Sequence, residues 1–259
     1  MMIQGKSCTL TVAKDDYYYP LPYSEETIRL ASKGYALPGV IGERNREKHV
    51  VTGQMIQGCF ITRLEYLNVL SLFLLLFSPD DRFDILTDRV CSKNIYKNLS
   101  TKSFELRADN KEAFYLRLDV KENDDSYVTD WTANTPSLKW VENRTYYFDG
   151  HCVMSDGVIL PLIYRFELNG IFTEKSKFQI KLYFPLSEKH YPIQKDIEKL
   201  TIKIDERDGV SIDLYDLQPV GDLTDVNCAD TVLCFQRYNI LSCVVLNIRN
   251  QNEKIEVVL

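Results

Sequence analysis

The sequence predicts a mainly β protein with an antiparallel β-sandwich or barrel-like core, one short buried apolar helix, and long loops or an arm. Three observations favour this class. Short runs of β-branched and aromatic residues recur between turn-forming residues. Several of these runs alternate apolar and polar side chains, as half-buried strands do. The dipeptides Asn169-Gly170 and Asp208-Gly209 stand between such runs and are typical of hairpin turns, which join antiparallel strands.

The first expected element is a strand from Ser7 to Lys14, where apolar and polar side chains alternate. Residues 15–40 follow with three prolines and little periodicity, and we expect an N-terminal arm or loop there. Within this tract a short helix can run from Ser24 to Ser32, because Ser24 is a suitable N-cap and two glutamates follow it.

A long strand is expected from Lys48 to Leu64, with Gly53 and Gly58 as points of a bulge or a close backbone approach. The apolar run from Leu64 to Phe77 is shorter than the about 20 residues that a bilayer-spanning helix needs. We interpret it as a buried helix that ends before the following proline. Residues Arg82 to Val90 can form the next strand.

A further strand is expected from Ala113 to Val120, because its apolar residues alternate strictly with polar ones. The segment from Lys121 to Thr145 is rich in charges and turn formers, which predicts a surface loop anchored by Trp131 and Trp140. We expect a single β-rich domain spanning residues 1–259, with residues 121–145 as the place for any subdivision.

The second half of the chain is expected to be a ladder of strands joined by short turns. The expected strands are Tyr146–Met154, Val158–Leu168, Ile171–Phe184, Lys199–Ile204, Val210–Tyr215, Thr231–Tyr238, Ile240–Arg249 and Lys254–Leu259.

The charge balance argues against nucleic-acid binding. The chain has 31 basic and 37 acidic residues, a formal net charge of -6, and no segment carries a basic stripe. Because an acidic surface repels phosphates, we expect no tight binding of nucleic acid. The N-terminus lacks the apolar region of a signal peptide, so we expect neither export nor a membrane partner.

The seven cysteines indicate reduced thiols. Their number is odd, and they show neither CxxC pairs nor the regular spacing of a disulfide scaffold. Most stand beside apolar residues, so we interpret them as small core hydrophobes.

No catalytic, metal or cofactor site is expected, and the protein is not expected to be an enzyme. His151 and Cys152 are adjacent, and neighbours on a strand point to opposite faces, so they cannot form a dyad by themselves. The acidic residues within Asp205–Gly209 lack the ligand spacing of a calcium loop. No phosphate-binding loop or nucleophile elbow is present. Three histidines in separate segments lack metal-ligand spacing: His49, His151 and His190.

Tyrosines gather in the N-terminal tract. Aromatic faces can stack on sugar rings, so one interpretation is a carbohydrate platform. Tyrosine is also enriched at protein interfaces, and we prefer a surface that docks on a neighbouring subunit. The residues of this expected assembly interface are Tyr17, Tyr18, Tyr19, Tyr23 and Tyr35.

The stretch from Tyr35 to Arg89 resembles the core of tail tube proteins of long-tailed bacteriophages. The likeness is a long strand with glycines, a short apolar helix and a return strand, within ALPGVIGERNREKHVVTGQMIQGCFITRLEYLNVLSLFLLLFSPDDRFDIL. The resemblance implies a structural subunit of the virion tail, forming hexameric rings that stack into a tube conducting DNA. Its partners would be copies of itself and other tail proteins. A tube initiator, baseplate or neck protein on the same scaffold would look alike.

The sequence alone leaves two other functions open. The first is a soluble β-sandwich binding module that recognises a glycan or a protein through its tyrosine-rich N-terminal region. The second is an enzyme whose active site is assembled from distant residues. Ring or tube assembly would distinguish the tail subunit from both.

Overall fold

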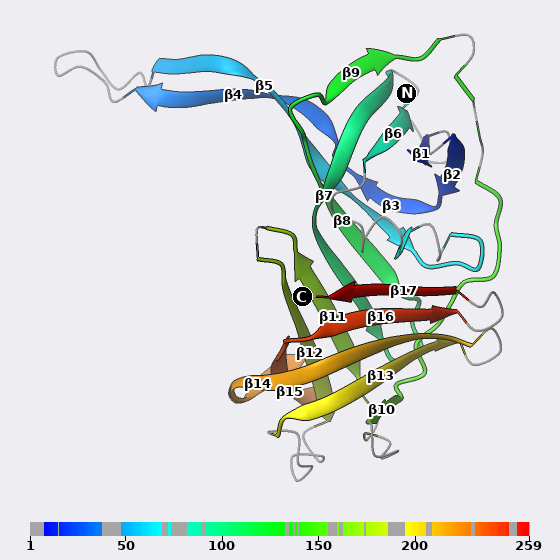
Figure 1. Ribbon diagram of the computed structural model, residues 1–259, viewed down its shortest axis with the longest axis vertical. Helices are drawn as coiled ribbons and strands as arrows, with labels where there is room; N and C mark the ends of the chain where they lie inside the picture. Colours follow the sequence, from blue (N-terminus) through cyan, green and yellow to red (C-terminus); the bar gives the residue numbers. More distant parts are fainter. Residues whose placement is uncertain are drawn as a thin grey trace.

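The computed structural model describes most of the chain, and the described part is built from strands (Figure 1). The described residues are 8–14, 16–37, 48–68, 72–73, 82–89, 92–132, 135–136, 138, 140–154, 160, 163–173, 175–185, 195–205, 209–228, 231–248 and 253–258. The strands are β1 (Thr9–Lys14), β2 (Tyr17–Leu21), β3 (Tyr23–Glu26), β4 (Arg29–Leu37), β5 (Lys48–Arg63), β6 (Phe83–Asp88), β7 (Lys93–Asp109), β8 (Tyr115–Lys121), β9 (Tyr127–Asp130), β10 (Cys152–Met154), β11 (Arg165–Ile171), β12 (Lys177–Pro185), β13 (Ile197–Asp205), β14 (Val210–Cys228), β15 (Thr231–Ile240), β16 (Cys243–Ile248) and β17 (Glu253–Val258).

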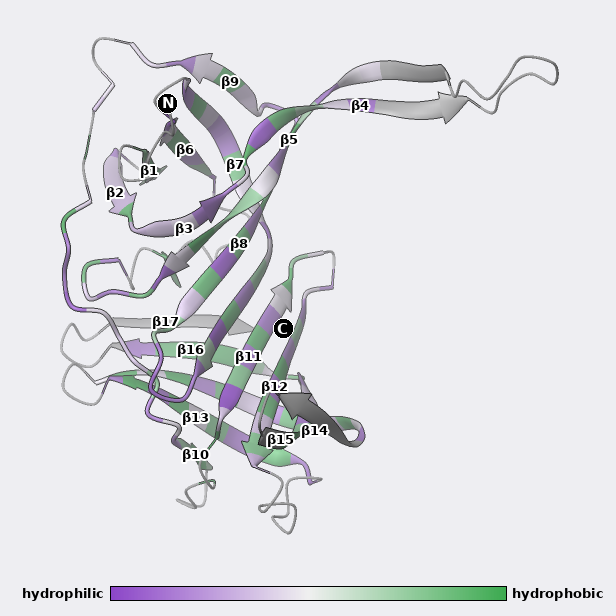
Figure 2. Cartoon of the chain, turned by 180° about the vertical axis from the view of Figure 1, so that it is seen from behind, coloured by the Kyte–Doolittle hydropathy of each residue, from purple (hydrophilic) through white to green (hydrophobic). Residues whose placement is uncertain are grey.

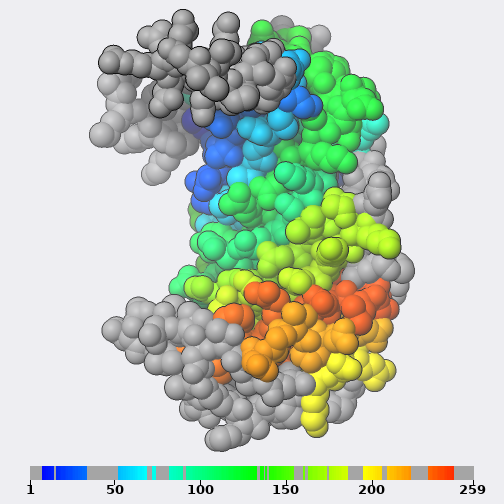
Figure 3. Space-filling view, turned by 90° about the vertical axis from the view of Figure 1, so that its left-hand side faces the viewer, coloured from blue at the N-terminus to red at the C-terminus, as the bar shows by residue number. Residues whose placement is uncertain are grey.

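The strands form one large antiparallel sheet with three regions. The N-terminal region has the order β2-β1-β6-β7-β9. The central region contains β5, β8, β7, β11, β12 and β15 in that order, with β3 and β4 on the outer side of β5. The C-terminal region has the order β10-β13-β14-β16-β17. Figure 3 shows the strands of the first half and β13–β16 at opposite ends of an elongated molecule.

Two long strands join these regions. The first part of β7 pairs with β6 and β9, and from Ser100 onward β7 pairs with β8. Between them Asn98 has a φ of 57°, a left-handed conformation that asparagine tolerates and that turns the strand from one region to the next. In the same way β14 pairs with β13 and β16 in its first half and with β15 in its second half.

Strict alternation places one face of each central strand in the core. In β8, Leu116 and Leu118 are fully buried, whereas Tyr115 and Arg117, which alternate with them, are exposed. Figure 2 shows the corresponding alternation of hydrophobic and hydrophilic residues along β8 and β11. The strand expected from Ala113 to Val120 is therefore confirmed, with its ends shifted.

The expected fold class is confirmed as mainly β and antiparallel, but the expected barrel-like closure is wrong. Each of the long strands β7 and β14 pairs with different strands along its length and so connects separate regions of the sheet. Among the described residues, the sheet does not close into a barrel, and several strands pair on one side only. These open-edged strands are β2, β3, β4, β9, β10 and β17.

The helix expected from Ser24 to Ser32 is wrong. These residues form β3 and the start of β4, which both pair with β5, and Ile28 between them is fully buried. Pairing with a long neighbouring strand thus outweighs a local capping signal. The tract 15–40, expected as an arm or loop, contains the strands β2, β3 and β4, and Leu21 at the end of β2 is only 2% exposed.

The apolar helix expected from Leu64 to Phe77 lies partly outside the described residues. Leu72 and Phe73 are helical and fully buried. The Leu72 N–H donates to the Asn68 carbonyl at 2.9 Å, which is the hydrogen bond of an α-helical turn. Residues 64–68 of the expected helix are described and are not helical, because Glu65 forms a β-bridge with Thr145 and residues 66–68 form a turn. Residues 69–71 and 74–77 are not among the described residues.

The hairpin turn expected at Asn169-Gly170 is wrong, because β11 runs straight through both residues. Gly170 lies opposite Phe104 of β7, and a Cβ on Gly170 would come within 2.2 Å of the Phe104 ring. The glycine is therefore needed for space and not for a turn. Of the turn expected at Asp208-Gly209, Asp208 lies outside the described residues. Gly209 has a φ of 63° and directly precedes β14, which pairs antiparallel with β13.

Candidate functional site

The hairpin formed by β4 and β5 extends beyond the rest of the sheet (Figure 1). β8 pairs with β5 over Gln57–Arg63. From Ile56 outward, the partner of β5 in the described structure is β4 alone. A two-stranded ribbon is only marginally stable in water by itself, so a ribbon of this length benefits from contact with another surface.

The ribbon presents exposed side chains on both strands. Leu30 on β4 is 45% exposed, although leucine is normally a core residue. Other exposed residues of the ribbon are polar or basic: Arg29, Ser32, Lys33, Thr52 and Gln54. The pairing is irregular between Lys33 and Gly34, where Thr52 is left without a partner residue beside Gly53. This places a bulge next to one of the two glycines at which a bulge was expected.

The root of the hairpin is the break between β3 and β4 at Thr27 and Ile28. The Thr27 N–H donates to the Cys59 carbonyl at 2.9 Å, and the Cys59 N–H donates to Thr27 Oγ1 at 3.1 Å. A side-chain hydroxyl therefore replaces one rung of the backbone ladder. Ile28 is fully buried and ties the break to the core.

Gly58 of β5 makes this break possible. Its φ is 142°, and a Cβ there would lie 2.5 Å from the Thr27 carbonyl oxygen and 2.6 Å from Ile28 Cα. Only a residue without a side chain permits so close a backbone approach. The expectation that Gly58 marks a close approach is confirmed.

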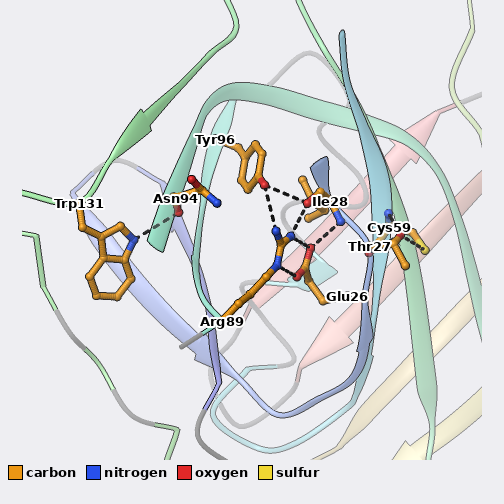
Figure 4. A network of polar contacts seen from close by, with 8 residues as sticks. All are labelled: Glu26, Thr27, Ile28, Cys59, Arg89, Asn94, Tyr96 and Trp131. Carbon is orange, nitrogen blue, oxygen red and sulfur yellow. Dashed lines mark hydrogen bonds and ion pairs between the residues drawn. The ribbon is translucent and has the colours of Figure 1, made fainter. Parts of the chain in front are cut away.

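Arg89, which follows β6, holds the root of the hairpin through contacts with Glu26 and Ile28 (Figure 4). Its Nε donates to Glu26 Oε2 at 2.7 Å, and its Nη2 donates to Glu26 Oε1 at 2.6 Å and also to the Ile28 carbonyl. The Tyr96 hydroxyl donates to the same carbonyl at 2.9 Å. Such a bidentate pair fixes both the distance and the orientation of its partners.

The electrostatics of the root follow from these contacts. Hydrogen bonds with Glu26 raise the pKa of Arg89, and they outweigh the opposing effect of burial. The guanidinium therefore stays charged. Burial, with smaller contributions from Cys8 and Glu26, raises the pKa of Tyr23 to about 12.

The four tyrosines of the expected interface whose side chains are described do not all lie on one face of the sheet. Tyr17 is 67% exposed and Tyr18 39% exposed, whereas Tyr19 lies opposite the fully buried Val12 and Tyr23 packs against the core. Neighbouring residues of a strand point to opposite faces, which separates Tyr18 from Tyr17 and Tyr19. Tyr35 lies in β4, and its side chain is outside the described part of the structure.

Tyr18 instead shares a sheet face with residues that sequence reasoning missed. It lies opposite Ala13, which lies opposite Asp84 of β6. Asp84 forms an ion pair with Lys97, which lies opposite Tyr127 of β9. The hydrogen bond that Lys97 donates to Asp84 raises the pKa of Lys97, and both tyrosines are close enough to add to that shift. No sequence signal links these residues, because four separate strand pairings bring them together.

The loop expected from Lys121 to Thr145 is anchored by both tryptophans, as expected. The Trp131 Nε1 donates to the Asn94 carbonyl at 3.3 Å. The Trp140 Nε1 donates at 2.8 Å to Glu65, a fully buried carboxylate that also accepts from Arg63 at 2.7 Å. The short strand β9 lies within this segment.

His151, Cys152 and Asp205 lie in different surroundings. His151 is exposed and the neighbouring Cys152 is fully buried, and burial raises the pKa of this thiol. Asp205 pairs with Arg144 at 3.5 Å. Within the described ranges, no group of three or more His, Cys, Asp or Glu side chains is arranged to hold a metal ion. His49 and His190 have no described side chains.

Among the residues that the structure describes, no helix has the length and apolar character to cross a membrane. Comparison of the sequence with protein-family models gave no match, and a search of curated proteins found no similar sequence. A functional assignment therefore rests on the contacts of the hairpin and its root.

Proposed function

We propose that this chain is a structural subunit of a phage tail, which forms hexameric rings that stack into a tube conducting DNA. In this proposal the partners are copies of the same chain and other tail proteins of the virion. The β4–β5 hairpin is the main contact between neighbouring subunits. Tube, tube initiator, baseplate and neck subunits share this requirement for contact between copies.

The projecting hairpin carries the proposal. It leaves the sheet at Ile56, exposes side chains of both strands, and is held at its root by the buried Ile28 and the Arg89–Glu26 pair. A rigid root with an exposed ribbon suits an element that inserts between other subunits. Leu30 on this ribbon is 45% exposed and offers apolar surface that a neighbouring subunit could cover.

Two further observations support assembly between copies. Strands with one unpaired edge among the described residues, such as β17 and β2, offer backbone groups that a neighbouring chain can pair with. The formal charge of -6 suits a channel wall, because DNA passes an acidic surface without being held by phosphate contacts.

Electron microscopy and sedimentation of the purified full-length chain test this proposal. We expect rings with sixfold symmetry, and stacked tubes at high protein concentration. A variant in which residues 34–51 are replaced by Asn-Gly retains β5 beyond Gln57 with its β3 and β8 partners, and we expect it to stay folded and monomeric. A wild-type chain that remains a monomer at all concentrations would contradict the proposal.

A binding module for a glycan or a protein is the second candidate, favoured by the sheet face with Tyr18, Lys97 and Tyr127. Exposed aromatic side chains beside a hydrogen-bonding ion pair suit the stacking and polar contacts of a sugar. A glycan array tests it: binding by the wild type that is lost in Y18A/Y127A, and kept in the control Y164A, would favour this candidate.

A further inference from the structure

The point at which the hairpin leaves the sheet is occupied by one carboxylate, that of Glu122. β8 ends at Lys121, which lies opposite Gln57 of β5. The next N–H of β5 toward β8, that of Ile56, has no strand partner there. It donates instead to Glu122 Oε2 at 2.8 Å. The carboxylate thus takes the place of the next rung of the ladder.

Glu122 also reaches the other strand of the ribbon. Its Oε1 accepts from Lys33 Nζ at 3.3 Å, and Lys33 lies opposite Gly53, three residues beyond Ile56. One side chain of the sheet therefore contacts both β5 and β4 just outside the last three-stranded position. Each of these two contacts restrains the angle of the ribbon to the sheet.

The two carboxylates near the hairpin differ in how firmly they are held. The Glu26 side chain is 6% exposed and bound in a bidentate manner by Arg89, so it belongs to the buried root. The Glu122 side chain is 27% exposed, and its partner Lys33 is 57% exposed. An exposed ion pair of this kind contributes little by itself, so the hydrogen bond to Ile56 is the stronger of the two contacts.

We propose that Glu122 is a positioning residue that sets the angle of the β4–β5 hairpin to the sheet and thereby allows subunits to join. The inference rests on the proposed function for the role of the hairpin in assembly. The first part of the inference, that Glu122 sets the angle of the hairpin, concerns a single chain and can be measured without assembly.

Hydrogen exchange of the full-length chain tests whether Glu122 restrains the hairpin. In E122A we expect amide exchange in peptides covering residues 29–37 and 48–57 to become about tenfold faster, because the Ile56 N–H loses its acceptor. Exchange in β12 should not change. E122Q keeps an acceptor oxygen for Ile56 and loses only the ion pair, so we expect it to resemble K33A and stay near the wild type.

Glu112 provides the matched control, because it is an exposed glutamate beside the other end of β8. We expect E112A to exchange and assemble as the wild type does, whereas E122A should assemble several-fold less and E122Q should assemble almost normally. Equal hairpin exchange in E122A and E112A would overturn the inference, and so would faster exchange with undiminished assembly. If the wild type never assembles, the proposed function fails, and the exchange rates alone decide whether Glu122 restrains the hairpin.

Discussion

Arg89 and Glu26 are 63 residues apart in the chain, yet they form a two-bond ion pair with distances of 2.7 and 2.6 Å. Arg89 follows β6, and Glu26 ends β3, so the pair joins the N-terminal region of the sheet to the root of the hairpin. The third contact of Arg89, to the Ile28 carbonyl, satisfies a buried backbone group at the break between β3 and β4.

Replacement of Arg89 by methionine should destabilise the protein by roughly 2–4 kcal/mol, because it leaves the Glu26 carboxylate buried without its cation. The value lies below that of a fully buried pair, since the Arg89 side chain is 29% exposed. Urea unfolding at neutral pH measures it. The double variant E26Q/R89M should lose less than R89M, and a loss below about 0.5 kcal/mol in R89M would show that the pair is not a clamp.

Substitution of Gly170 should be harmful because of the Phe104 ring and not because of backbone conformation. We expect G170A to lose about 1–3 kcal/mol through overpacking. Shortening the opposing ring in F104L/G170A should recover part of that loss. G53A is the control, since no atom lies within 4 Å of a Cβ at Gly53. Thermal unfolding of the wild type, G170A, F104L/G170A and G53A measures these losses. Equal losses of stability in G170A and G53A would contradict the role of the Phe104 ring.

Alkaline pH should destabilise the fold through Tyr146. Burial raises the pKa of Tyr146 to about 12. The unfolded chain has a tyrosine pKa of about 10, so the folded state holds this proton more tightly. The stabilisation is complete below pH 10 and is lost as the pH rises from about 10 to about 12. We expect Y146F to lose less stability over this range than the wild type.

Chemical denaturation at a series of pH values provides the measurement. Y17F is the control. Because Tyr17 is 67% exposed, this substitution should leave the alkaline transition unchanged. An identical pH dependence in Y146F and the wild type would show that another group governs alkaline unfolding.

The strand pattern is visible in the sequence wherever apolar and polar residues alternate without interruption, as in β8 and β1. The long strand β7 is not apparent there, because Asn98 bends it and its buried face changes where it passes from one region of the sheet to the next. At Gly170 the local hairpin signal is misleading, since the glycine accommodates a ring from a strand far away in the sequence.

The hairpin is only half predictable. Its β5 strand has β-branched residues and is expected from Lys48 to Leu64, whereas the Ser24 cap signal indicates a helix where β3 and β4 lie. The residues that hold the hairpin cannot be found from sequence, because Glu26, Arg89 and Glu122 belong to three separate segments. In the sequence alone, their acidic and basic side chains cannot be distinguished from charged residues on a solvated surface, because only the strand pairing shows which of them meet.

The most direct measurement compares the assembly of two leucine variants by sedimentation and electron microscopy. Leu30 on the ribbon is 45% exposed, and Leu241 after β15 is 55% exposed, so L30E and L241E make the same change at similarly exposed positions. We predict rings and tubes for the wild type and L241E, and folded monomers for L30E. Rings and tubes formed equally well by L30E would contradict the claim that the hairpin joins the subunits.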